Sequence, residues 1–178
     1  MLYIRETDDT DLEKILFVEK EAFGIDKEAE LTRDILADPS AEPILSLLAF
    51  VDEQPVGHIL FSKGQVLGNP ELSVSILAPL AVLPNFQRQR IGGELIKKGL
   101  QKRSADGVDI MFVLGHPDYY PRHGFVPAGK LGFEAPFPIP EKVADAWMVQ
   151  ELRPNVIGSV SGKVICCDAL NKPEHWHE

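Results

Sequence analysis

The segment that most constrains the fold of this chain runs from Leu72 to Leu114. Leu72–Leu83 alternates apolar residues as a strand does, a turn follows, and an apolar stripe with helical spacing continues to about Ser104. The nearly all-apolar run Val108–Leu114 is typical of a strand that is covered on both faces. A strand, a helix and a strand in this order predict two parallel neighbours joined by a right-handed crossover.

Pro79 lies inside the first of these strands. A proline has no N–H group to donate to a neighbouring strand, so it is confined to sheet edges and bulges. We therefore expect the strand to be irregular around Leu77–Pro79.

The other periodic segments surround this unit. The further expected strands are Leu2–Arg5, Leu47–Val51, Val56–Val66, 124–126, Ala144–Leu152 and Lys163–Cys167. The further expected helices are residues 12–23, capped by side chains of 8–11 and stopped by Gly24, then Lys27–Ala37 and a short turn at Asp118–Arg122. These elements predict one mixed α/β domain over residues 1–170, followed by a loose polar tail, residues 171–178.

Composition excludes several classes of protein. The 178 residues carry a formal net charge of −9, which argues against nucleic acid as a partner because its phosphates would be repelled. Apolar runs fall far short of the roughly 20 residues that span a membrane, and the N-terminus lacks a signal-peptide pattern, so we expect a cytoplasmic protein. Cys166 and Cys167 are adjacent, which disfavours a disulfide and makes no zinc site. We expect no bound metal.

The turn after the first strand carries the strongest chemical signal. It reads Gln87-Arg88-Gln89-Arg90-Ile91-Gly92-Gly93 and leads into a helix. The first N–H groups of a helix have no internal partner and its N-terminus is electropositive, so such a turn can bind a phosphate. Taken alone, the same pattern also fits an ordinary strand–helix connection with exposed arginines.

Two motifs in order resemble the GNAT superfamily of N-acetyltransferases, and within it a YhbS-like bacterial subgroup. Gln87 and Gly92 match the first and last positions of the family's Gln/Arg-x-x-Gly-x-Gly/Ala loop, whereas Arg90 replaces its first glycine. Downstream, residues 119–125 resemble the family's Tyr-x-x-x-Gly-Phe element. Arginine suits position 90 if its φ is negative and disfavours the loop geometry if φ must be positive.

The resemblance implies a GNAT-like fold, with a mostly antiparallel central sheet, helices on both faces and acetyl-CoA held where a parallel pair of strands splays apart. Backbone groups of Leu80, Ala81 and Val82 would contact the pantetheine and polarise the thioester. The pyrophosphate would lie on the loop residues Gln87, Arg88, Gln89, Arg90, Ile91, Gly92 and Gly93.

The family's general acid corresponds to Tyr120, which would otherwise be an aromatic packed beside Phe125. Candidate bases are Glu19, Glu21 and His116, although residues of these types are more often surface or packing residues. No serine or cysteine has a visible set of catalytic partners, so we expect direct attack by an amine in a ternary complex.

The acceptor amine stays open: a small molecule and a protein amine are both compatible with the sequence. The main alternative is a GNAT-like module that binds acetyl-CoA or acyl-CoA without catalysis. A transferase of longer acyl groups and a nucleotide-binding protein are further alternatives. Edge strands near the C-terminus could also pair between two copies of the chain in a homodimer.

Overall fold

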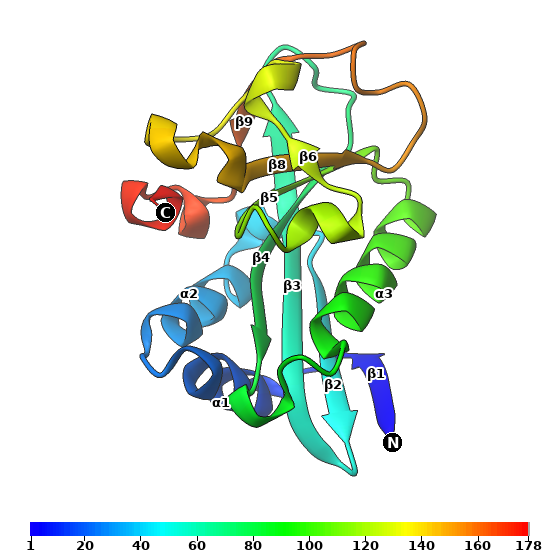
Figure 1. Ribbon diagram of the computed structural model, residues 1–178, viewed down its shortest axis with the longest axis vertical. Helices are drawn as coiled ribbons and strands as arrows, with labels where there is room; N and C mark the ends of the chain where they lie inside the picture. Colours follow the sequence, from blue (N-terminus) through cyan, green and yellow to red (C-terminus); the bar gives the residue numbers. More distant parts are fainter. Residues whose placement is uncertain (178) are drawn as a thin grey trace.

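A computed structural model describes residues 1–177, and in it a single mixed sheet runs through the molecule. The strands lie in the order β1-β2-β3-β4-β5-β8-β6, while β9 pairs with both β3 and β7 (Figure 1). The strands of this sheet are β1 (Leu2–Glu6), β2 (Leu45–Val51), β3 (Gln54–Val66), β4 (Val74–Val82), β5 (Ile110–Leu114), β6 (Val126–Pro127), β7 (Phe133–Glu134), β8 (Trp147–Glu151) and β9 (Gly162–Ile165).

The pairing confirms the topology expected from the sequence. β1 to β4 are successive antiparallel neighbours, and β4 and β5 are parallel. β5 and β8 are antiparallel, so β4–β5 is the parallel step in this path through an otherwise antiparallel series. The predicted fold class, a mixed α/β domain with a parallel central pair, is therefore confirmed.

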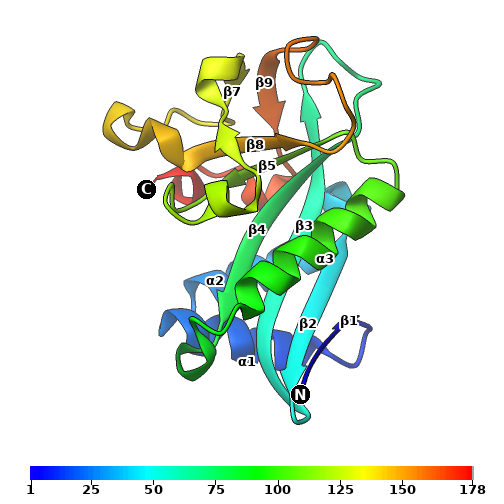
Figure 2. The same cartoon turned by 45° about the vertical axis from the view of Figure 1, so that its right-hand side comes forward.

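The helices cover both faces of the sheet. α1 (Leu12–Phe23) and α2 (Lys27–Leu36) pack together on one face, and α3 (Ile91–Ala105) crosses the other (Figure 2). Gly57 of β3 marks the α3 face, because a Cβ added there would lie 3.0 Å from Leu95. His58, the next residue of β3, consequently points to the α1 face, since successive side chains alternate.

The irregularity predicted at Pro79 is present as a bulge in β4. Ile59 of β3 pairs with Leu80, but Phe61 pairs with Leu77, so Leu60 faces two residues of β4. The pairing of β4 with β5 also ends at Leu77, while β4 continues along β3 to Val82. The C-terminal half of β4 therefore leaves its edge toward β5 open.

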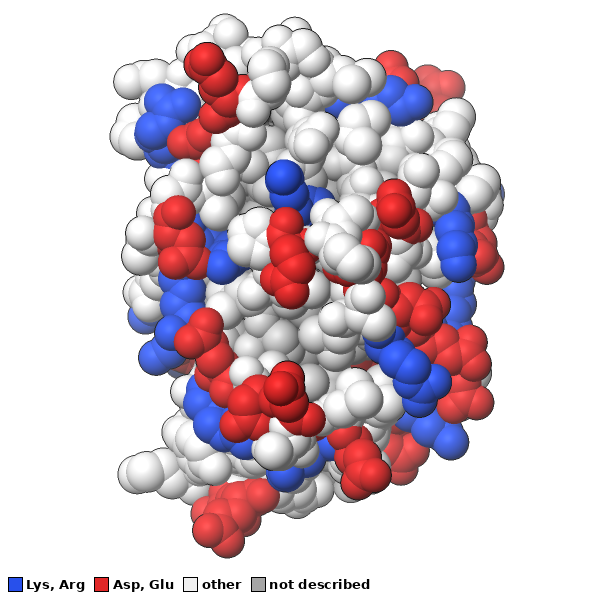
Figure 3. Space-filling model, turned by 180° about the vertical axis from the view of Figure 1, so that it is seen from behind, with Lys and Arg blue, Asp and Glu red and all other residues white. Residues whose placement is uncertain are grey.

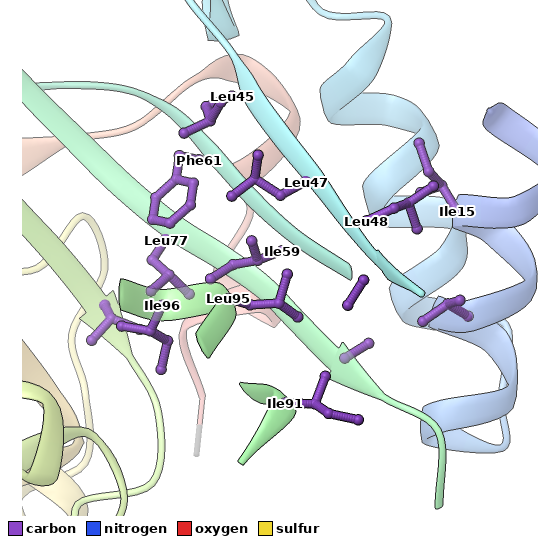
Figure 4. Packing of buried hydrophobic residues seen from close by; sticks show 14 of the residues in the cluster. Ile15, Leu45, Leu47, Leu48, Ile59, Phe61, Leu77, Ile91, Leu95 and Ile96 are labelled. Atoms are coloured by element: carbon purple, nitrogen blue, oxygen red, sulfur yellow. The ribbon is translucent and has the colours of Figure 1, made fainter. Parts of the chain in front are cut away.

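The core joins the two layers of helices through the sheet. In Figure 4 Phe61 and Leu77 lie beside Leu95 and Ile96 of α3, and each of these side chains is at most 1% exposed. Burying a side chain of this size stabilises a fold by roughly 1.5–3 kcal/mol. This packing fixes α3, and with it the loop that precedes α3, against β3 and β4.

Two local predictions near the N-terminus had different outcomes. Gly24 ends α1 as expected, with a left-handed φ of 71°. The predicted side-chain caps from residues 8–11 are wrong, because no side chain caps α1. The carboxylate of Asp11 instead receives hydrogen bonds from Arg5 Nη1 and Nη2 at 2.7 and 2.9 Å, and this pair ties the start of α1 to β1.

The C-terminal segment is packed rather than loose, which corrects the expectation for residues 171–178 as far as the described residues extend. Pro173–Trp176 forms a 3₁₀ turn, and Trp176 is 2% exposed. Its indole Nε1 donates to the Leu170 carbonyl at 2.8 Å, and its ring lies edge-on to Trp147 at 5.6 Å. The predicted strand 144–152 is also shorter, since Glu141–Ala146 is 3₁₀ helix.

Charged side chains of both signs are interspersed on the face seen from behind in Figure 3. Among residues 1–177, no helix is both long and apolar enough to cross a membrane.

Candidate functional site

A cleft of about 1420 Å³ opens where β4 and β5 separate. Typical sites for one small ligand occupy roughly 300–1,000 Å³, so this cleft has room for an extended molecule and a second substrate. Its walls come from the ends of α1 and α2, from β4, the loop before α3, the segment after β5 and the C-terminal turn. Of the predicted site residues, the cleft is lined by Leu80, Val82, Gln87, Arg88, Arg90, Ile91, Gly92, Gly93 and Tyr120.

Two predicted residues, Ala81 and Gln89, do not line the cleft. Ala81 stands opposite His58 in the β3–β4 pairing and shares its face, the face of α1. Gln89 donates its side-chain amide to the Asn85 carbonyl at 3.2 Å. Any contact of Ala81 or Gln89 with a ligand in the cleft would be made by their backbone groups.

The loop before α3 has an unusual backbone. Arg88 and Arg90 have φ of 64° and 67°, in the left-handed region that favours glycine. The condition under which arginine suits position 90, a negative φ, is therefore not met. The loop is ordered by Gln87, whose Nε2 donates to the Val82 carbonyl at 3.1 Å.

The N-terminus of α3 opens onto the cleft. The Glu94 N–H donates to the Arg90 carbonyl at 3.0 Å as α3 begins. The N–H groups that precede it have no acceptor within a helix, and they carry the positive end of its dipole. With the side chains of Arg88 and Arg90 on the same wall, this is a site suited to phosphate.

The two glycines of α3 are needed for packing as well as for access. A Cβ on Gly92 would lie 2.5 Å from the Tyr119 hydroxyl oxygen, and a Cβ on Gly93 would lie 2.9 Å from His123 Cε1. The sequence analysis placed both glycines in the pyrophosphate loop. In the structure they also let the segment after β5 close against α3.

The tyrosine pair lies at the centre of this segment. Tyr120 lines the cleft, is 8% exposed, and packs edge-on against Phe125 and Tyr119 at 5.7 and 5.2 Å. Burial raises the pKa of Tyr119, with Arg122 opposing that shift. Burial lowers the pKa of His123, and Arg122 lowers it further.

The three candidate bases have separate environments. His116 lines the cleft and is exposed, with its Nδ1 accepting from the Asp118 N–H at 3.2 Å. Glu21 is exposed on α1 and is not part of the cleft wall. Glu19 is fully buried behind that wall. Of the three, only His116 has direct access to the cleft.

Glu19 belongs to a buried polar chain that crosses from α1 to β2. Its Oε2 lies 2.6 Å from His58 Nδ1, and His58 Nε2 lies 2.8 Å from Ser46 Oγ. A serine therefore does have a histidine and a carboxylate in line, contrary to expectation. Ser46 and His58 lie outside the cleft wall, so this serine has no access to a substrate there.

For the end of the cleft formed by α1, α2 and the C-terminal turn, the sequence indicated an acceptor site from about residues 20–45 and the C-terminal third but named no lining residue. Phe23, Lys27, Glu28 and Leu31 line it from one side, and Glu174–His177 from the other. Lys27, Glu28 and Leu31 recur at helical spacing within α2, which is the signal that could have shown a shared face. The C-terminal contribution has no such signal, because it depends on Trp176 packing.

No group of three or more histidine, cysteine, aspartate or glutamate side chains within residues 1–177 is arranged to hold a metal ion.

A mixed sheet with a splayed parallel pair, and a helix start suited to phosphate at the splay, define a class of acyl-group transferases. Residues 10–133 match the profile of the Acetyltransferase (GNAT) family, and the chain belongs to that family.

Two relatives from Escherichia coli strain K12 match nearly the whole chain. The uncharacterized N-acetyltransferase YjhQ is 45% identical over 164 residues, covering 91% of this chain and 90% of YjhQ. The uncharacterized N-acetyltransferase YhbS is 31% identical over 154 residues, covering 86% and 89%. The subgroup resemblance found in the sequence is confirmed by these matches.

Two solved structures share the fold closely. YhbS from Escherichia coli, crystallised in complex with CoA, has a TM-score of 0.87 at 28% identity and covers 96% of this chain and 92% of its own. A GNAT family acetyltransferase from Brucella melitensis, in complex with acetyl-CoA, has a TM-score of 0.75 at 28% identity, covering 96% and 98%.

Proposed function

We propose that this protein transfers an acetyl group from acetyl-CoA to a primary amine by direct attack in a ternary complex. The observation that carries the proposal is the separation of β4 from β5 after Leu77, next to the open N-terminus of α3. A single cleft thus joins an unpaired strand edge to a phosphate site. The CoA-bound and acetyl-CoA-bound structures of similar proteins support the choice of cosubstrate.

The pyrophosphate and the pantetheine of acetyl-CoA each have a proposed place in the cleft. The amides of residues 88–93 would hold the pyrophosphate, with Arg88 and Arg90 adding charge. The pantetheine would lie along the open edge of β4, where backbone groups of Leu80 to Val82 are not paired with β5. An N–H group on this edge would polarise the thioester carbonyl and stabilise the oxyanion that forms.

The reaction moves three protons, because the acceptor nitrogen loses two and the leaving thiolate gains one. The acceptor, an ammonium ion at neutral pH, must lose a proton before its nitrogen can attack the carbonyl carbon. The C–N bond forms, the C–S bond breaks, and the thiolate takes a proton. Tyr120 is the proposed donor of that proton, because it lines the cleft in the segment after β5.

The proposal is tested by titrating the protein with CoA and by measuring thiol release from acetyl-CoA with a panel of amines. We expect Tyr120→Phe to lower kcat about 100-fold or more, with little change in CoA affinity. Tyr3→Phe is the matched control, since Tyr3 is 47% exposed on β1 and lies outside the cleft wall. An unchanged kcat and alkaline limb in Tyr120→Phe would remove the general-acid role.

The left-handed Arg90 favours one alternative, a module that binds acetyl-CoA without catalysis. Acetyl-CoA binding with no thiol release on any amine, together with no acetylation of the protein itself, would support that alternative. Acetyl transfer to the protein alone, with parallel double-reciprocal plots, would instead contradict the ternary complex.

A further inference from the structure

Glu28 of α2 lines the end of the cleft that is formed by α1, α2 and the C-terminal turn. We place the acceptor amine there and call it the amine end. Glu28 is half-buried and lines the cleft beside Phe23 and Leu31. Its Oε2 is buried and has no hydrogen-bond partner among residues 1–177. A buried carboxylate oxygen without a donor is costly, and it is satisfied by a proton or by a cationic ligand.

A second carboxylate oxygen without a partner lies on the neighbouring helix, α1. Glu19 of α1 is fully buried, and its Oε1 likewise has no hydrogen-bond partner within the described part of the chain. Burial raises the pKa of Glu19, the hydrogen bond with His58 opposes this rise, and the charge of Glu28 adds to it. The charge of Glu28 on α2 therefore acts on Glu19 across the α1–α2 contact.

The Glu19 carboxylate is hydrogen-bonded to a second group that can hold a proton, the imidazole of His58. Its other oxygen, Oε2, is 2.6 Å from His58 Nδ1, and the imidazole is held in turn by Ser46. A proton can lie on Glu19 or on His58 with the hydrogen bond between them retained in both states. Both side chains are fully buried, so neither exchanges a proton with solvent directly.

We propose that Glu28 is the base that takes the proton from the acceptor amine, and that the Glu19–His58 pair behind it accepts and stores that proton. This inference rests on the proposed acetyl transfer. The ammonium loses a proton to the Glu28 carboxylate and becomes the nucleophile. After the C–N bond forms, the nitrogen loses its second proton, which restores the proton that Tyr120 gives to the leaving thiolate. The stored proton returns to solvent through Glu28 when the product leaves.

The proposal also predicts the chemical class of the acceptor. A carboxylate at the cleft end selects a cationic ammonium group, and Phe23 and Leu31 beside it suit an apolar stem. The other charged groups facing this end are Lys27 on α2, Glu174 and His175 on the C-terminal turn, and His116 after β5.

The pair Glu28→Gln and Glu30→Gln tests the base. Both residues are on α2, but Glu30 is exposed and lies outside the cleft wall. We expect Glu28→Gln to lower kcat about 100-fold or more while leaving the dissociation constant of CoA unchanged, and Glu30→Gln to match the natural protein. Equal kcat for all three proteins, measured across pH, overturns the proposal.

Glu19→Gln tests whether the Glu19–His58 pair holds the proton, because Glu19 acts through Glu28 and touches no substrate. We expect the acidic limb of the pH profile of kcat/KM to move to lower pH, because the variant lacks the carboxylate of Glu19, whose negative charge acts on Glu28. A loss of stability alone would lower the amount of active protein and leave the limb in place. An unmoved limb contradicts the proton store.

A measurement without turnover separates this inference from the proposed function. The carboxyl carbon of Glu19 is followed by NMR as pH is varied, in the natural protein and in Glu28→Gln. We expect Glu19 to titrate at lower pH in the variant. Identical titrations overturn the coupling of the two carboxylates, whether or not any amine is acetylated; absence of acetylation by the natural protein, with CoA bound, contradicts the proposed function.

Discussion

Arg90 holds a left-handed backbone conformation at the residue that precedes α3. A side chain in that conformation costs roughly 1–2 kcal/mol, because its Cβ approaches the carbonyl oxygen that follows. The guanidinium on the cleft wall offsets that cost in function if it contacts a phosphate. Backbone geometry and charge at this position can be separated by two substitutions.

We predict that Arg90→Gly is more stable than Arg90→Ala by about 1 kcal/mol, because both remove the charge but only glycine relieves the backbone. Urea unfolding followed by circular dichroism, without ligand, measures this difference. At low salt both variants should bind CoA more weakly than the natural protein, and by the same factor. High salt should reduce this difference in affinity. Equal stability of the two variants would show that the left-handed conformation carries no cost.

Residue-scale features of the site were predicted unevenly. Arg88 and Arg90 were recognised as cleft residues because a glycine pattern surrounds them, but φ depends on the closure of α3 against β4 and is not encoded in residue type. Glu19 was considered as a base from its residue type and its place on α1. Its burial and its contact with His58 join positions 39 apart, so no local pattern carried them.

At the scale of elements, α3 approaches the sheet closely at one glycine. A Cβ added to Gly99 would overlap the ring of Phe61, a fully buried side chain of β3. This contact sets the distance between α3 and the sheet, and with it the height of the phosphate loop above β4. Gly99 is therefore a structural determinant of the site although it lies outside the cleft wall.

We predict that Gly99→Ala destabilises the protein by about 1–3 kcal/mol through overpacking, despite the better helix propensity of alanine. Gly129→Ala is the matched control, because nothing lies within 4 Å of a Cβ there, and it should change stability by less than about 0.5 kcal/mol. Equilibrium urea unfolding gives both values. A Gly99→Ala variant as stable as the control would contradict the tight contact.

Element order and the bulge were predictable because each has a short-range physical cause. Pro79 cannot donate a hydrogen bond, and the apolar run at 108–114 requires cover on both faces. The helix caps expected from residues 8–11 failed for a non-local reason. Asp11 has a stronger partner in Arg5, and its carboxylate is occupied there instead of at the helix start.

At the scale of the whole molecule, segments far apart in the sequence meet at the cleft. β8 places Trp147 opposite Leu114 of β5, and the C-terminal turn then brings Trp176 onto Trp147. The amine end of the cleft is thus closed by residues from the last part of the chain. A polar composition had indicated a loose tail, since one buried tryptophan is a weak signal among charged neighbours.

We predict that Trp176→Ala costs about 3 kcal/mol of stability and raises KM for the amine, with the dissociation constant of CoA nearly unchanged. Lys172→Ala, an exposed position of the same segment, is the control and should leave both quantities unaffected. Urea unfolding and steady-state kinetics provide the measurements. An unchanged KM in Trp176→Ala would mean that this turn does not contribute to the acceptor site.

The contact between Trp147 and Trp176 has a practical consequence, because these are the two tryptophans of the sequence. All intrinsic indole emission of the protein therefore originates from one corner, and Trp176 itself faces the cleft. Quenching or a spectral change on adding an amine would report docking at that end without any label. No tryptophan lies in the loop at residues 87–93, so docking of the acceptor should change this emission more than binding of CoA does.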